Sequence, residues 1–212
     1  IWLRLKLMAD AGMVGLPNAG KSTFVSAVSR AKPKIADYPF TTLKPQLGVV
    51  FVDQREFVVA DIPGLIAGAH EGHGLGDRFL GHIERCNTIL HMIDATGEDI
   101  VDAYKTIRHE LDSYGGGLSE KKEVIGLNKC DALDDELIEM LSNELRAVTD
   151  SPIVPISAVT RFGIDEMLRA LLENIDQAHN AEGYTSERPG YYDLDDDAEV
   201  IEKPQEGGWS PI

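Results

Sequence analysis

The residues best suited to chemistry lie in one glycine-rich stretch near the start of the chain. Residues 15–23 read GLPNAGKST, which has the form G-x-x-x-x-G-K-[ST] of a phosphate-binding loop. Gly15 and Gly20 permit the backbone dihedrals that turn successive N–H groups into one concavity. Lys21 is expected to reach the β- and γ-phosphates, and the Ser22 hydroxyl to bind Mg²⁺. The remaining residues predicted to contact the nucleotide here are Leu16, Pro17, Asn18, Ala19 and Thr23.

The alternative for this stretch is a chance glycine loop, and the flanking sequence argues against it. An apolar run at residues 11–14 precedes the loop, and an amphipathic stretch at residues 24–28 follows it. Strand, loop and helix therefore come in the order that a phosphate-binding loop requires, with the helix N-terminus facing the anion. Such a loop alone fits ATPases, kinases and GTPases, so other residues must distinguish these classes.

A second polar motif, DIPG at residues 61–64, follows another apolar run. Asp61 is expected at the carboxyl edge of the sheet beside the phosphate-binding loop, where it can hold Mg²⁺ through water. The Gly64 N–H can then sense a γ-phosphate, and Ile62 and Pro63 lie between them. The alternative is an aspartate that only forms the turn before Pro-Gly.

The motif NKCD at residues 128–131 indicates which base is bound. The Asp131 carboxylate can accept hydrogen bonds from the N1–H and N2–H₂ edge of guanine, whereas adenine offers no matching donor pair. The aliphatic stem of Lys129 could cover the purine face, and Asn128 could brace the loop. Cys130 completes the motif, which in isolation is also compatible with an ordinary polar loop. Residues 157–159 (Ser157, Ala158 and Val159) follow the last predicted strand and could bring a backbone N–H to the guanine O6.

The elements that must position these motifs alternate between strands and helices, which predicts an α/β fold. We expect a Ras-like P-loop NTPase with a mostly parallel six-stranded sheet, one antiparallel edge strand and helices on both faces. A tight turn at Gln54 and Arg55 is predicted to join the two strands of an early hairpin. The predicted strands are residues 11–14, 46–53, 56–61, 88–93, 123–127 and 153–156, and the predicted helices are residues 24–28, 77–85, 99–114, 134–148 and 163–175.

Composition and charge bound the remaining possibilities. The chain has 212 residues and a net charge of −16, which argues against this chain alone coating nucleic acid. Residues 1–55 nevertheless carry eight Lys and Arg against three Asp, so any contact with a polyanion should favour the N-terminal third of the chain. No apolar run approaches the roughly 20 residues of a membrane-spanning helix. Cys86 and Cys130 form no metal spacing and no evident disulfide framework, so each is predicted to be a small buried residue in a reducing, cytoplasmic setting.

The domain organisation expected from the sequence has three parts. Residues 1–8 alternate apolar and basic and are a residual strand or linker, residues 9–179 form the GTPase domain, and residues 180–212 are an acidic, weakly ordered tail. Because the first residues, IWLRLK, lack an initiator Met, we expect a fragment of a longer protein, and we expect it to be monomeric.

Taken together, the motifs resemble the GTPase domain of the Obg family over residues of about 9 to 178. The resemblance is carried by GLPNAGKST, YPFTTLKPQLGVV, DIPGLIAGAHEGHGLGDRFLGHIERC, NKCD and SAV. It implies a GTP-hydrolysing switch that binds GTP and GDP, requires Mg²⁺ and acts in assembly of the large ribosomal subunit or in stress control. The family's glycine-rich N-terminal domain is not recognisable here. A guanine site also makes binding of the alarmone ppGpp chemically possible.

The resemblance assigns a first switch segment with nucleotide contacts from Phe40, Thr41, Thr42, Leu43 and Lys44. In this loop, which is predicted to be mobile, the Thr42 hydroxyl could complete the Mg²⁺ shell beside Ser22. The residues expected to act directly in catalysis are Lys21, Thr42 and Gly64.

Water activation has no evident side chain. Ras-like enzymes place a glutamine after D-x-x-G, and this chain has Leu65 there, so slow intrinsic turnover is expected. The resemblance makes residues 61–64 the start of a second switch segment. His70, Glu71 and His73 are candidates in that segment, although solvated loop residues are the favoured interpretation. Zinc binding by His70, His73 and His82 is less favoured still.

Asn18 suggests one further device, because an asparagine at this place in related GTPases resembles a potassium ligand. A K⁺ ion there would supply the positive charge that the transition state needs, and the alternative is a loop hydrogen bond. A nucleotide-dependent binding module with little hydrolysis of its own, and a P-loop kinase or ATPase, are the other function classes considered.

The base assignment makes a direct prediction for Asp131→Asn. The variant should lose GTP affinity and gain affinity for xanthine nucleotides, because the 2-oxo group of xanthine needs a donor where guanine needs an acceptor. Nucleotide titration of the two proteins measures both changes, and an unchanged GTP affinity would contradict the assignment.

Overall fold

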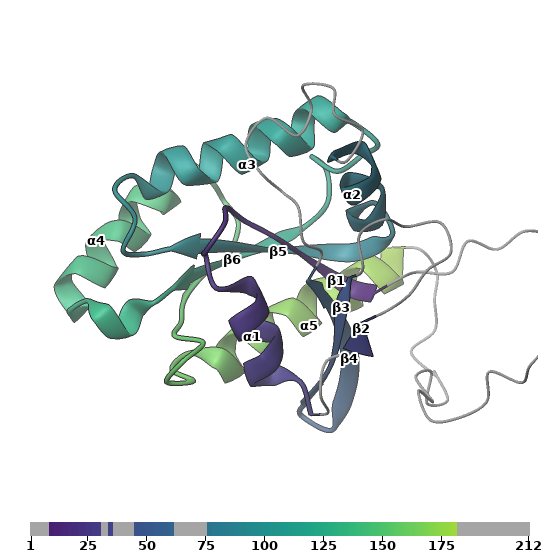
Figure 1. Cartoon of the computed structure of the whole chain (residues 1–212), viewed down its shortest axis with the longest axis horizontal. Coiled ribbons are helices and arrows are strands. Elements are labelled where there is room, and N and C mark those ends of the chain that lie inside the picture. Colours follow the sequence, from purple (N-terminus) through teal and green to yellow (C-terminus); the bar gives the residue numbers. More distant parts are fainter. Residues whose placement is uncertain (1–8, 31–33, 36–44, 62–75, 182–212) are drawn as a thin grey trace, which may run out of the picture.

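The computed structural model describes residues 9–30, 34–35, 45–61 and 76–181. Over these residues, seven strands form one sheet in the order β2-β3-β4-β1-β5-β6-β7 (Figure 1). The strands are β1 (Ala9–Val14), β2 (Lys34–Ile35), β3 (Gln46–Val52), β4 (Arg55–Asp61), β5 (Cys86–Asp94), β6 (Glu123–Asn128) and β7 (Ile153–Pro155). The helices are α1 (Lys21–Val28), α2 (Gly76–Ile83), α3 (Ile100–Tyr114), α4 (Asp135–Arg146) and α5 (Ile164–Ala181), with a short 3₁₀ turn at Cys130–Ala132.

The sheet is parallel from β4 to β7 and antiparallel at one edge. Strand β1 lies between β4 and β5, and β6 and β7 continue in parallel, whereas β3 runs antiparallel to β4. The predicted fold class is therefore confirmed, and the two-residue strand β2 adds to the six predicted strands. Because parallel strands end at the same edge, the carboxyl ends of β1, β4, β5, β6 and β7 gather there.

The turn between β3 and β4 differs from the sequence prediction by one residue. Asp53 and Gln54 form it, with φ of 48° and 65°, and both left-handed values match the two-residue turn that suits the twist of a hairpin. Arg55 was expected in the turn but instead begins β4, where it pairs with Val52 and donates two hydrogen bonds to Asp176 of α5.

The helices cover both faces of the sheet, as predicted (Figure 1). Helices α1 and α5 pack on one face, where Phe24, Val25 and Leu171 belong to one buried cluster. Helices α2, α3 and α4 cover the other face through two further clusters. None of the helices within the described ranges is long and apolar enough to cross a membrane.

The last helix is longer than predicted. It was expected to end at Ile175 but runs to Ala181, two residues beyond the predicted domain boundary. Contacts with distant strands hold the added turns, since Asp176 binds Arg55 and the His179 ring lies 2.6 Å from the Asn87 amide. Contacts between residues so far apart in the sequence cannot be predicted from local periodicity.

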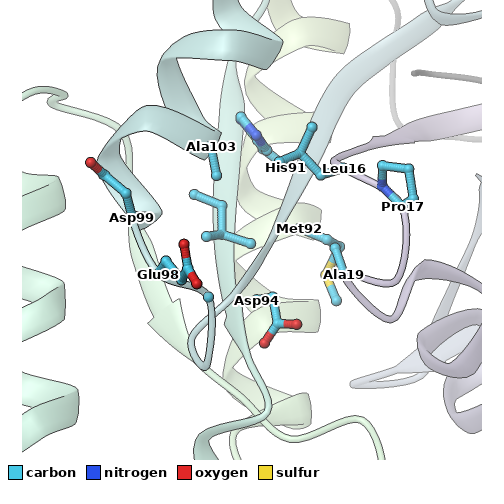
Figure 2. A pocket seen from close by; sticks show the side chains of 11 residues that line it. Leu16, Pro17, Ala19, His91, Met92, Asp94, Glu98, Asp99 and Ala103 are labelled. Atoms are coloured by element: carbon cyan, nitrogen blue, oxygen red, sulfur yellow. The ribbon is translucent and has the colours of Figure 1, made fainter. Parts of the chain in front are cut away.

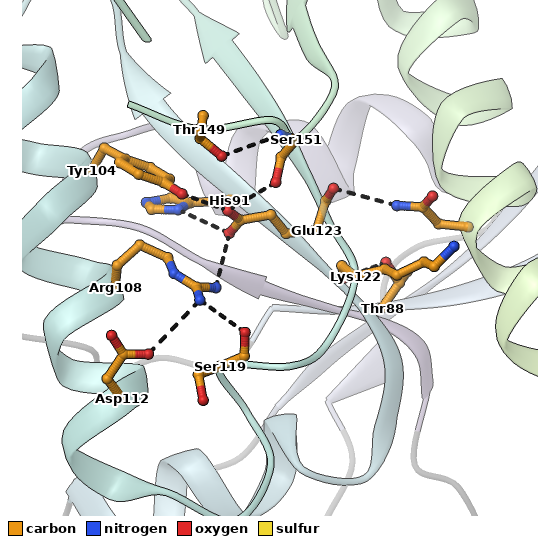
Figure 3. Close-up of polar contacts among 11 residues, drawn as sticks. Thr88, His91, Tyr104, Arg108, Asp112, Ser119, Lys122, Glu123, Thr149 and Ser151 are labelled. Carbon is orange, nitrogen blue, oxygen red and sulfur yellow. Dashed lines mark hydrogen bonds and ion pairs between the residues drawn. The ribbon is translucent and has the colours of Figure 1, made fainter. Parts of the chain in front are cut away.

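A buried carboxylate fastens α3 to the two strands that lead to the shared edge. The Tyr104 hydroxyl donates to Glu123 Oε1 at 2.9 Å, and Arg108 Nη1 and His91 Nδ1 each lie 3.6 Å from Glu123 Oε2 (Figure 3). The His91 and Tyr104 rings stack at 5.2 Å. Burial alone would raise the pKa of Glu123, but the interactions with His91, Arg108 and Tyr104 outweigh it and lower the pKa.

This network predicts that Glu123→Gln destabilises the fold at neutral pH. Loss of the charge leaves Arg108 and His91 poorly paired, so the free energy of unfolding should fall by about 1–3 kcal/mol. Since the folded-state pKa of Glu123 lies below the usual 4.5, its contribution is present above that pH and is lost as pH falls through the folded value.

Urea denaturation of both proteins at pH 7 and below pH 4 measures this difference, which should shrink in acid. The exposed Glu120 provides the control, because Glu120→Gln should leave the unfolding free energy within about 0.5 kcal/mol of wild type. Equal stability of wild type and Glu123→Gln at pH 7 would show that the network contributes nothing.

Candidate functional site

The loop between β1 and α1 is packed so tightly that only glycine fits at its two ends. Gly15 has φ of 146°, and a Cβ there would lie 2.3 Å from the Met92 main-chain oxygen. Gly20 has φ of 95°, and its Cβ would lie 2.2 Å from Asn128 Nδ2. The loop is therefore shaped against the ends of β5 and β6. Asn18, at its exposed tip, adopts a left-handed φ of 63°.

The Lys21 ammonium lies over this loop. Its Nζ donates to the main-chain oxygens of Gly15 at 2.8 Å and Leu16 at 3.0 Å. Burial lowers the pKa of Lys21, and the nearby Asp61 carboxylate opposes that shift. Because an ammonium has three N–H donors, two carbonyls leave one donor available for an anion.

The fold brings together two predicted metal-binding oxygen groups from distant parts of the chain. The Ser22 hydroxyl, in the first turn of α1, donates to Asp61 Oδ2 at the end of β4 at 2.5 Å. Asp61 is buried, so its carboxylate is held in place. A hydroxyl and a carboxylate are hard oxygen ligands of the kind that Mg²⁺ prefers.

Asn128 joins three loops through one buried carboxamide. Its Nδ2 donates to the main-chain oxygen of Ala19 at 2.8 Å, and its Oδ1 accepts from the Ala158 N–H at 3.0 Å. Ala19 belongs to the loop after β1, Asn128 ends β6, and Ala158 follows β7. The phosphate-binding loop, the NKCD motif and residues 157–159 thus form one connected surface.

Lys129 is held by a residue that the sequence analysis missed. Its Nζ lies 2.5 Å from Asp94 Oδ2, and Asp94 Oδ1 accepts from the Thr96 N–H at 3.0 Å and hydroxyl at 2.7 Å. Burial would raise the pKa of Asp94, but the hydrogen bonds from Lys129 and Thr96 lower it overall. The sequence did contain a sign of this role. Asp94 directly follows the apolar run of β5, so it should lie at the same carboxyl edge of the sheet as the other motifs.

The remaining base-site candidates follow β6 and β7. Asp131 is exposed within the 3₁₀ turn, whereas Cys130 is buried and its N–H donates to the Ile156 main-chain oxygen at 3.1 Å. Ser157 and Ala158 are buried, and Val159 is 76% exposed. The Asp131 carboxylate is therefore open to a ligand, whereas Ser157 and Ala158 are not exposed.

A cavity of about 220 Å³ lies between the phosphate-binding loop and the start of α3 (Figure 2). Leu16 and Pro17 approach it from the loop, and Asp94 and Asp99 from the β5–α3 connection. Its lining also includes Ala19, His91, Met92, Ile93, Gly97, Glu98 and Ala103.

Several predicted site residues lie outside the described part of the chain. These are residues 40–44 of the first switch, residues 62–64 of the DIPG motif, and Leu65, His70, Glu71 and His73. His82 is described and is buried in α2, where burial, followed by the charge of Arg85, lowers its pKa. Within the described ranges, no group of three or more His, Cys, Asp or Glu could hold a metal ion.

The two cysteines are small buried residues, as predicted. Cys86 and Cys130 are both free thiols. Burial raises the pKa of Cys86 to about 12, and burial also raises that of Cys130. Neither thiol is therefore ionised near neutral pH.

The packing of the loop predicts that Gly20→Ala disrupts the connected surface of the phosphate-binding loop, the NKCD motif and residues 157–159, and destabilises the fold. The added methyl would displace the Asn128 amide, so the unfolding free energy should fall by roughly 2–4 kcal/mol. Gly117→Ala is the matched control, because Gly117 also has a left-handed φ of 74° but open space at its Cβ. It should cost only about 1–2 kcal/mol. Thermal unfolding compares the two, and equal losses would contradict the steric argument.

Solved structures of GTP-binding proteins share this fold. An NFeoB mutant from S. thermophilus bound to GDP superposes with a TM-score of 0.61 at 20% sequence identity. The match covers 81% of this chain and 64% of the NFeoB chain. The G domain of the T. maritima FeoB iron transporter gives 0.58 at 19%, covering 77% and 96%. A nucleolar GTP-binding protein 1 from Plasmodium falciparum gives 0.56 at 25%, covering 82% and 88%.

The sequence also matches a protein family directly. Residues 10–129, more than half of the chain, match the family described as 50S ribosome-binding GTPase. The matched region begins in β1, contains the phosphate-binding loop and ends at Lys129 in the NKCD motif. Because this match covers more than half of the chain, the chain belongs to the 50S ribosome-binding GTPase family.

Proposed function

We propose that this chain binds guanine nucleotides at the edge described above and hydrolyses GTP to GDP and phosphate as a molecular switch. One observation carries the proposal: the Asn128 carboxamide joins the phosphate-binding loop to both loops that follow β6 and β7. A ligand that spans this surface needs phosphates at one end and a base at the other. Residues 9–179 form the proposed GTPase domain, and residues 180–212 an acidic tail.

The phosphate end of the ligand is assigned to residues 15–23. The N–H groups at the start of α1 attract an anion, and the partly buried Lys21 ammonium adds a full positive charge. At the base end, Asp131 accepts from the guanine edge, the Lys129 stem covers the purine face, and the loop at Ser157 reaches O6.

Mg²⁺ is the proposed cofactor. Ser22 and Thr42 would ligate it directly and Asp61 through water, and the Ser22–Asp61 contact places two of these groups together. The ion neutralises charge on the β- and γ-phosphates. Because Mg²⁺ commonly binds to substrate phosphates and keeps several waters, the nucleotide would supply further ligands.

Turnover is proposed to be slow without a partner. The position after DIPG holds Leu65, whose side chain cannot orient water, so the Lys21 ammonium and the backbone N–H of Gly64 are left to stabilise charge on the γ-phosphate. Residues 40–44 and 61–64 are the proposed switch segments. Asn18, at the exposed tip of the loop, is the proposed ligand of a K⁺ ion.

The proposed partner is the large ribosomal subunit, supported by the description of the family and by the resemblance to Obg proteins. We place the chain in the cytoplasm, where its two free thiols would stay reduced. The same guanine site would admit ppGpp. Assembly of the subunit or stress control is the proposed role, with the chain acting as a monomer.

The experiment that tests this function measures GTP affinity by titration in Mg²⁺, with ATP as competitor, and then phosphate release. GTP should bind, ATP should compete at least about a hundredfold more weakly, and large ribosomal subunits should accelerate release. Lys21→Ala should bind GTP more weakly without unfolding. Strong ATP competition would refute guanine recognition. Equal rates of phosphate release in KCl and NaCl would refute the proposal that Asn18 binds K⁺.

A further inference from the structure

The Lys129 side chain is held at its ammonium end by a residue outside its own loop. Its Nζ lies 2.5 Å from Asp94 Oδ2, at the end of the neighbouring strand β5. Both side chains are only about one-third exposed, at 37% for Lys129 and 28% for Asp94. The pair therefore lies at the boundary between the core and the proposed base site.

The Asp94 carboxylate is itself held in one orientation. Its Oδ1 accepts from both the N–H and the hydroxyl of Thr96, which leaves Oδ2 directed at the lysine. The backbones are also joined, because Asp94 pairs with Asn128 in the β5–β6 register and the Ala95 N–H donates to the Asn128 oxygen at 2.8 Å. The acceptor of the ammonium is thus rigidly placed relative to the NKCD loop.

The backbone of Lys129 adds a second constraint. Its φ of 69° lies in the left-handed region, which is uncommon for a residue with a side chain. With the backbone fixed at one end and the ammonium at the other, the four methylenes must extend between them. A free lysine side chain loses rotamer entropy when it is ordered, and here that ordering precedes ligand binding.

We propose that Asp94 is a positioning residue that holds the Lys129 stem as a preformed apolar surface for the face of a purine base. The inference rests on the proposed function, since it concerns how the base end of that site is built. Asp94 itself does not contact the nucleotide. Because its carboxylate accepts from the lysine and from Thr96, it has no role in reading the edge of the base.

Removing this anchor should weaken the binding of every purine nucleotide equally, whether or not its base makes all the contacts with Asp131 that guanine makes. Asp94→Asn is isosteric and keeps an oxygen for Thr96, but it presents no charge to Lys129. The affinities for GTP, GDP and ITP should therefore fall by one common factor of roughly three to ten. The ratio of GTP to ITP affinity should stay at the wild-type value, which a disordered base loop would not preserve.

The test is a double-mutant cycle on the full chain, with nucleotide affinities measured by titration and folding checked by thermal unfolding. Wild type is measured first, and absence of GTP binding would refute the proposed function without addressing Asp94. Lys129→Met keeps an apolar stem but has no ammonium to anchor. Asp94→Asn, Lys129→Met and the double variant should all lose the same factor. Asp53→Asn is the control and should bind GTP like wild type, because it removes a carboxylate that pairs with Arg169 at the β3–β4 turn, away from the site.

Three results would overturn the proposal. Wild-type GTP affinity in Asp94→Asn would show that the anchor is unnecessary. A further loss on adding Asp94→Asn to Lys129→Met would show that Asp94 acts through another group. Unchanged GTP affinity in Lys129→Met would exclude the anchored stem, and this outcome decides even if Asp94→Asn fails to fold.

Discussion

The buried Asn128 carboxamide is the interaction on which the site depends. It donates to the Ala19 oxygen and accepts from the Ala158 N–H, so one side chain satisfies polar groups of two other loops. Leaving a buried polar group unpaired costs about 1–3 kcal/mol, which makes the loss of either contact expensive. The absence of a side chain at Gly20 is what allows Asn128 to come so close.

The sheet brings these groups together by register rather than by proximity in sequence. Asp94 lies opposite Asn128 across β5 and β6, and Leu127 lies opposite Pro155 across β6 and β7. The loops that follow these residues therefore begin at neighbouring points. Further back along the same strands, Glu123 fastens α3 to the sheet, so the strand ends are supported from within the core.

The sequence was sufficient for the fold class and for which segments carry polar motifs, because apolar periodicity and glycine spacing are local properties. Contacts between distant residues could not be predicted in the same way. Asn128 was expected to brace its loop, but its two partners follow only from the strand order. Asp94 was overlooked because its role depends on the neighbouring strand. Arg55 and the last turns of α5 were misplaced for the same reason, since their mutual contacts stabilise them.

The most direct measurement of the central claim is the GTP affinity of Asn128→Ala, determined by isothermal titration with unfolding measured in parallel. Asn128→Ala should lose at least tenfold in GTP affinity and should still unfold cooperatively, at lower stability. Asn174→Ala is the matched control, because Asn174 is also buried but donates to the Glu123 main-chain oxygen, away from the site. It should keep wild-type affinity. Wild-type GTP affinity in Asn128→Ala would contradict the claim that this carboxamide assembles the site.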